Sequence, residues 1–246
     1  MDLKRTLNKW GELLGNPDWY SAVVSDIEDI RKEYNDKGEA EQNGVKNGIY
    51  DFFERHIRAN DIALDEYPPD ADAERKPIDT IVIHHTSNPP GMSRERLSAI
   101  ELVRLYAPEF AAPKRAEDAG MKGRPIYSGH FREGRQVFWP YHWFVRGDGT
   151  VERLLEDDEI GWQAGSWDVN CRSAAICFDG NFENARPLDV ELAAAARIIK
   201  EHYPQVAHER ILGHREVNPK TTCPSNLFLS SAHHRGWKND LLLLLK

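Results

Sequence analysis

Histidines and a cysteine, widely separated along the chain, are residues of the types that bind zinc. His84 and His85 are adjacent, and His214 and Cys223 flank a short segment that contains Pro219. A catalytic zinc ion takes three protein ligands from histidine, cysteine or carboxylate and leaves a fourth position open. The sequence therefore predicts a zinc site formed by His84 or His85 together with His214 and Cys223.

Each of these residues also has an ordinary interpretation. A histidine pair at the end of a strand more often packs in the core or lies at the surface than binds a metal. Cys223 alone fits a small buried thiol, and Tyr141 alone fits a strand residue that packs its ring. The metal hypothesis therefore depends on a fold that brings the three ligands together.

A short apolar stretch directly precedes the histidine pair. Residues 80–83 are β-branched or apolar, which is typical of a strand covered on both faces. Pro89, Pro90 and Gly91 follow and end it. The carboxyl end of a strand, where the chain opens into a loop, is the usual place for chemistry in α/β proteins.

Further strands and helices are predicted after this stretch. Asp148-Gly149 is a strong hairpin signal between two apolar runs, and Ser93 is a suitable N-cap. The pattern predicts α/β class, with a central mixed β-sheet flanked by helices. The expected elements are helices over 93–106, 189–203 and 237–245, strands over 137–145, 151–155 and 174–179, an extended piece at 210–212, and a long loop over 108–128.

The first part of the chain is predicted to be helical. Apolar residues recur at helical spacing over 4–14 and 19–34, and a third stripe runs from Val45 to Ile57. Gly38 and the polar run after it predict a break before that stripe. Residues 67–77 are rich in proline and charge and predict a linker. We therefore expect a helical N-terminal extension with linker over 1–75 and a second domain over 76–246.

Composition excludes some partners. The formal net charge is −8, and nucleic-acid binding needs clustered positive charge. No apolar run approaches the roughly 20 residues that cross a bilayer, and the polar N-terminus lacks the apolar core of a signal peptide. We expect a cytoplasmic protein, or one exported by an unrecognised route. The sequence does not indicate an oligomeric state.

The cysteines are too few for a disulfide framework. The chain has Cys171, Cys177 and Cys223. One alternative is a disulfide between Cys171 and Cys177, with Cys223 outside any disulfide. The other is that Cys177, in a strand-like run, is a buried thiol.

Blocks of sequence over roughly residues 78–245 resemble the N-acetylmuramoyl-L-alanine amidases of the type 2 amidase and peptidoglycan recognition protein superfamily. All of them occur in the family's order. They are IVIHHTS from Ile81, YHWFVRGDGTV from Tyr141, IGWQAG from Ile160, AICFDGNF from Ala175 and GHREVNPKTTCP from Gly213.

The resemblance implies a ligand set for Zn²⁺. His84 matches the first ligand, and His214 and Cys223 match the second and third. His85 would then point to the other side of its strand and be structural, because side chains alternate along a strand.

The resemblance also implies catalytic residues. Tyr141 matches a tyrosine whose hydroxyl would orient the attacking water or help transfer its proton. Thr221 matches the position that stabilises the oxyanion. The spacing from His214 to Cys223 is about one residue longer than the phage-type pattern, so Lys220 is the alternative.

The substrate groove is implied by a further block. Where the family has Trp-His-Ala-Gly, this chain has Trp162-Gln163-Ala164-Gly165. Trp162, Gln163 and Asn170 are the expected substrate-binding residues, and packing of Trp162 in the core is an equal alternative. The implied activity is zinc-dependent hydrolysis of the amide between N-acetylmuramic acid and L-alanine, in peptidoglycan or a muropeptide. The alternative is a peptidoglycan-binding module without catalysis, but such relatives usually lack a ligand.

Overall fold

The structure, a computed structural model, describes residues 2–246. The chain forms two compact units. Unit 1 contains the chain up to Asp70 together with Ser93–Phe138, and unit 2 contains Ala71–Met92 and Trp139–Lys246. The division into domains 1–75 and 76–246 stays a prediction, and the compact units group Ser93–Phe138 with the N-terminal helices. No helix within residues 2–246 is long and apolar enough to span a membrane.

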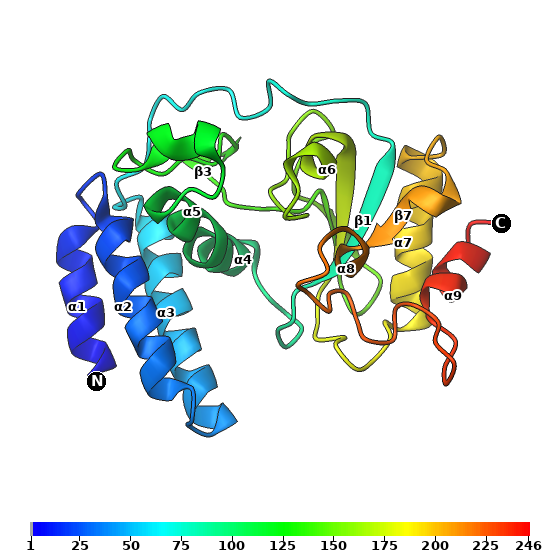
Figure 1. Ribbon diagram of the computed structural model, residues 1–246, viewed down its shortest axis with the longest axis horizontal. Helices are drawn as coiled ribbons and strands as arrows, with labels where there is room; N and C mark the ends of the chain where they lie inside the picture. The colour runs from blue at the N-terminus through cyan, green and yellow to red at the C-terminus, as the bar shows by residue number, and fades with distance from the viewer. Residues whose placement is uncertain (1) are drawn as a thin grey trace. The chain divides into compact units, whose positions relative to one another are not determined.

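Unit 1 is built on helices, of which α1, α2 and α3 lie side by side (Figure 1). Their apolar residues are buried. Trp10, Trp19 and Phe53 are buried, with the Trp19 and Phe53 rings 5.4 Å apart. Helix α3 packs against α4, and α2 packs against α5. The helices are α1 Leu3–Leu13, α2 Trp19–Tyr34, α3 Glu39–Ala59, α4 Arg94–Glu101, the π-helical turn η1 Leu102–Tyr106 and α5 Ala107–Ala111.

The expectations for unit 1 are mostly confirmed, with two corrections. Ser93 caps α4, since its hydroxyl accepts from the Arg96 N–H at 3.0 Å. The predicted break is confirmed at Gly38, since α2 ends at Tyr34 and α3 begins at Glu39. Its expected extension over the polar run after Gly38 is wrong, because that run is helical and its first-turn carboxylates favour a helix start. The expected 108–128 loop contains the end of α5 and a 3₁₀ helix, η2 Ala116–Met121. A small hairpin follows, β2 Phe131–Arg132 with β3 Arg135–Gln136.

Unit 2 contains a mixed sheet, as predicted. Its five strands, counted over residues 2–246, lie in the order β5-β4-β6-β1-β7. Strand β5 is antiparallel to β4, and the other neighbours are parallel. The strands are β1 Thr80–His85, β4 Trp143–Val145, β5 Val151–Arg153, β6 Ser173–Phe178 and β7 Ile211–Gly213.

One face of this sheet carries the apolar core. Ile81 and Ile83 of β1, with Ile176 of β6, pack in one cluster with helix α7 (Asp189–His202) and with Leu241 of α9 (Lys238–Leu243). Helices α7 and α9 lie side by side in Figure 1. Because side chains alternate along a strand, His84 points away from this core. The remaining helices of the unit are α6 Trp167–Arg172, η3 His208–Arg210 and α8 His214–Val217.

Two sequence-based expectations for unit 2 need correction. The strand expected over 137–145 is formed only by Trp143–Val145. Pro140 lacks the N–H that a ladder needs, which accounts for the late start. Cys171 and Cys177 are buried thiols that form no disulfide, so the alternative with a bridge between them is wrong.

His142, directly before β4, connects β6 to the loop after β5. Its Nδ1 accepts from the Ala175 N–H at 3.1 Å, and its Nε2 lies 3.0 Å from the Glu159 carbonyl oxygen. Burial, and after it the positive charges of Arg75 and Arg153, lower the pKa of His142 to about 3. The folded protein therefore keeps this imidazole neutral in mild acid.

This neutral histidine makes unit 2 sensitive to acid. Below about pH 6.5 the unfolded chain binds a proton at His142 that the folded chain does not, so stability falls as the pH falls. His142 alone accounts for about 3 kcal/mol between about pH 6.5 and about pH 4. Urea unfolding across this range should show a smaller loss for His142→Gln than for the parent chain. Equal losses in the two proteins would contradict the assignment.

Candidate metal centre

The first candidate ligand, His84, lies at the carboxyl end of β1. Its side chain is 1% exposed and faces away from the helix-covered side of the sheet. Its Nδ1 lies 3.7 Å from Cys223 Sγ, and its Nε2 lies 2.6 Å from Gln163 Oε1. Both ring nitrogens therefore have defined surroundings, and Nδ1 is the one that faces the other candidate ligands.

His214 arrives beside His84 because of strand register. Strands β1 and β7 are parallel, with Ile83 opposite Gly213, so His84 and His214 follow at the same edge of the sheet. Their ring centroids are 4.7 Å apart. Gly213 is needed here, since a Cβ would lie 2.6 Å from a ring carbon of Phe228.

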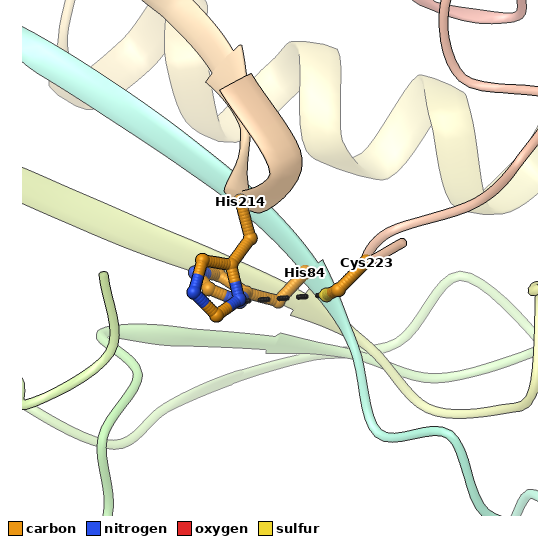
Figure 2. Close-up of side chains that lie close together, drawn as sticks. All are labelled: His84, His214 and Cys223. Carbon is orange, nitrogen blue, oxygen red and sulfur yellow. Dashed lines mark hydrogen bonds between the residues drawn. The ribbon is translucent and has the colours of Figure 1, made fainter. Parts of the chain in front are cut away.

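The third candidate, Cys223, is brought back by the segment after α8. Its carbonyl oxygen accepts from the Arg215 N–H at 2.7 Å. Its own N–H donates to the Thr221 hydroxyl at 3.1 Å. The possible ligand atoms of His84, His214 and Cys223 all lie within 4.8 Å of one another, and Figure 2 shows the three side chains converging. The structure thus brings together the ligand set expected from the sequence.

The state of the imidazoles suits a metal. Burial, and then the proximity of His214, hold the pKa of His84 well below its usual range, and burial lowers the pKa of His214 to about 4. Both rings are therefore neutral near pH 7 and carry a lone pair. Nε2 of His214 is buried and has no hydrogen-bond partner among residues 2–246. An orphaned imidazole nitrogen beside a thiol and a second imidazole fits a zinc site.

The proposed catalytic residues have different surroundings. Tyr141 is buried just before β4, not within a strand, and its ring centroid lies 5.0 Å from that of His84. Thr221 lies beside Cys223 through the hydrogen bond described above. Lys220 is exposed, and its backbone N–H donates to Asn218 Oδ1.

His85 occupies the other side of the strand, as expected. It is buried, and its Nδ1 accepts from the Phe182 N–H at 2.9 Å. Phe182 packs against the sheet core. His85 therefore connects β1 to the loop after β6, away from Cys223.

The expected substrate-binding residues do not form one surface. Gln163 and Asn170 are buried, with relative exposures of 6% and 7%. Trp162 is only partly buried, and its ring lies edge-on to that of Trp167, with centroids 6.2 Å apart. Of the three residues, Trp162 alone has substantial access to solvent.

Two residues of the site surroundings were not expected from the sequence. Ser173 Oγ lies 2.9 Å from Gln163 Nε2, and the backbone of Ala164 hydrogen-bonds His214. A serine at a strand start and a backbone group carry no local signal of this kind. Both contacts join residues that are paired only by the tertiary fold.

Solved structures that are similar to part of this chain include amidases and peptidoglycan recognition proteins. An endolysin amidase, LysCS from Clostridium intestinale URNW, is 23% identical, with 62% of this chain and 78% of that chain covered and a TM-score of 0.42. Drosophila peptidoglycan recognition protein SD is 24% identical, with coverages of 61% and 76% and a TM-score of 0.39. The Ph2119 endolysin from a Thermus scotoductus bacteriophage is 21% identical, with coverages of 69% and 86% and a TM-score of 0.41.

Sequence comparison gives the family. Comparison with curated proteins yields no match. The sequence profile of a family described as N-acetylmuramoyl-L-alanine amidase matches residues 74–226, which is more than half of the chain. The matched region contains β1, β4, β6 and β7 with His84, His214 and Cys223. The chain therefore belongs to the N-acetylmuramoyl-L-alanine amidase family.

Proposed function

We propose that this protein is a zinc-dependent amidase. It cleaves the amide between the lactyl group of N-acetylmuramic acid and the L-alanine of the stem peptide, in peptidoglycan or a soluble muropeptide. The observation that carries the proposal is the convergence of His84, His214 and Cys223, whose possible ligand atoms lie within 4.8 Å of one another. Family membership supplies the substrate class.

The proposed ligands are His84 through Nδ1, His214 through Nε2 and the Cys223 thiolate. Zinc, when bound, supplies a Lewis acid that polarises a carbonyl and makes water nucleophilic near neutral pH. The low pKa values of the two imidazoles keep them unprotonated in the range where such an enzyme works.

Tyr141 is the proposed proton-handling residue. Its ring lies beside that of His84, with a centroid separation of 5.0 Å, and is nearly buried. A phenol can both donate and accept a hydrogen bond. Its hydroxyl would orient the attacking water and pass a proton toward the leaving amine.

Thr221 is the proposed oxyanion donor. Its hydroxyl accepts from the Cys223 N–H, which leaves the hydroxyl hydrogen available to donate. A donor placed next to a ligand is well located for charge that develops on the scissile carbonyl oxygen. Lys220, with its exposed ammonium group, is the alternative donor.

Trp162 is the proposed contact for the sugar. It lies directly before Gln163, next to the site, and it retains solvent access. An indole face can cover the apolar face of a pyranose ring.

Replacing the thiolate separates cleavage from binding. Cys223→Ser should lose zinc and lower stem-peptide release at least about 100-fold, while the protein still sediments with insoluble peptidoglycan. Cys171→Ser, a matched change at another buried thiol, should keep both zinc and activity. The measurements are elemental analysis and chromatography of released peptides. Full activity of Cys223→Ser would refute the ligand assignment.

Removal of metal should be reversible. Treatment with a strong chelator should abolish peptide release from purified muropeptides, and added Zn²⁺ should restore it. If the zinc-loaded protein binds peptidoglycan fragments and releases no peptide from any of them, the protein is a binding module and not an amidase.

Substitution can also distinguish the two candidate oxyanion donors. Thr221→Val keeps the shape and removes the hydroxyl, so kcat should fall about 100-fold or more if Thr221 is the donor. Lys220→Ala should then leave kcat nearly unchanged. The reverse pattern in steady-state kinetics would assign the role to Lys220.

A further inference from the structure

We propose that residues 162–165, here called the 162–165 loop, orient both metal-binding imidazoles, and that Gln163 is a positioning residue for the metal and not a substrate contact. The inference rests on the metal site of the proposed amidase. It concerns how the ligands are held, and this can be measured without any substrate.

The contact between Gln163 and His84 decides which ring nitrogen is free. Gln163 Oε1 lies 2.6 Å from His84 Nε2, and a carbonyl oxygen can only accept. A neutral imidazole carries one N–H, so the Nε2–H that donates to Gln163 leaves the lone pair on Nδ1. Nδ1 is the atom that lies 3.7 Å from Cys223 Sγ.

The Gln163 side chain is itself held in place. Its Nε2 donates to Ser173 Oγ at 2.9 Å, and the residue is 6% exposed. A carboxamide held at both ends within a buried site cannot easily turn away from the ring. Solvent and substrate have little access to it, so a role in substrate recognition finds no support in this geometry.

The next residue acts on the other imidazole. The backbone of Ala164 hydrogen-bonds the His214 ring, and a backbone carbonyl oxygen accepts a ring N–H. Nε2 of His214 has no hydrogen-bond partner among the described residues 2–246. The ring therefore donates through Nδ1 and directs Nε2 toward the other ligands.

Asn170 fixes the backbone of this loop. Its Oδ1 accepts from the Gln163 N–H at 3.2 Å and from the Ala164 N–H at 2.8 Å. Gly165 has a φ of +67°, and a Cβ there would lie 2.7 Å from Asn218 Nδ2. The loop is thus held by α6 on one side and approaches the segment between His214 and Cys223 on the other.

These contacts allow one loop to orient both His84 and His214. Consecutive residues of a single loop set the orientation of ligands that come from two different elements, β1 and α8. Partners of this kind fix the tautomer of a metal-binding histidine, and their removal typically lowers metal affinity about 10- to 100-fold.

The test is zinc affinity in variants of Gln163, measured by competition with a chromophoric chelator. Gln163→Leu keeps the volume and removes the acceptor, so its affinity should fall about 10- to 100-fold. Gln163→Glu restores an acceptor for the Nε2–H and should return the affinity to within about threefold of the parent chain. Co²⁺ absorption spectra report in parallel whether the thiolate remains a ligand.

A matched control exists in unit 1. Gln136 is also 6% exposed, and its hydrogen-bond partners are Ser128 and the Asp65 carbonyl and not the ligands. Gln136→Leu should leave zinc affinity unchanged. If Gln163→Leu keeps the parent affinity, or if Gln136→Leu loses as much, the positioning role is refuted.

A second measurement uses the parent protein, so it does not depend on whether a variant folds. In the metal-free parent protein, ¹⁵N NMR of the imidazole should show His84 as the Nε2–H tautomer and His214 as the Nδ1–H tautomer. The opposite tautomer of His84 would overturn the inference. A protein that binds zinc in the Gln163-dependent way and cleaves no muropeptide would refute the proposed amidase activity and leave this inference standing.

Discussion

The metal centre depends on the parallel pairing of β1 with β7. Their register sets Ile83 opposite Gly213, so the residue that follows each of them in the chain is a histidine, and both histidines emerge at one sheet edge. A shift of one residue would turn His84 toward the apolar core that α7 covers. The burial of Ile81 and Ile83 on the covered face therefore determines the side of the sheet to which His84 points.

Much of this arrangement could be predicted from the sequence. The apolar run before His84 indicates a buried strand, and alternation along it separates His84 from His85. The helices of unit 1 follow from their apolar stripes, with α2 at its expected bounds. The ligand set came from sequence blocks in family order, since spacing alone left His84 and His85 as alternatives. Local signals succeed where a residue's role follows from its neighbours in the chain.

Other features depend on contacts that no local pattern encodes. The resemblance implies a substrate groove that contains Gln163 and Asn170, yet both side chains are buried and hydrogen-bonded. His84, which Gln163 contacts, lies 79 residues away along the chain. Likewise, the grouping of Ser93–Phe138 with the N-terminal helices follows from long-range packing of α3 on α4 and of α2 on α5.

The separation of the ligands along the chain has a mechanical consequence for unit 2. His84 and Cys223 are 139 positions apart, so an ion held by both would close a ring containing most of the unit. Cross-linking a ring of that size removes about 5 kcal/mol of chain entropy from the unfolded state in the simplest treatment. The ion would then act as a reversible cross-link. A chelator of divalent cations would lower the stability of the sheet and also abolish the proposed activity.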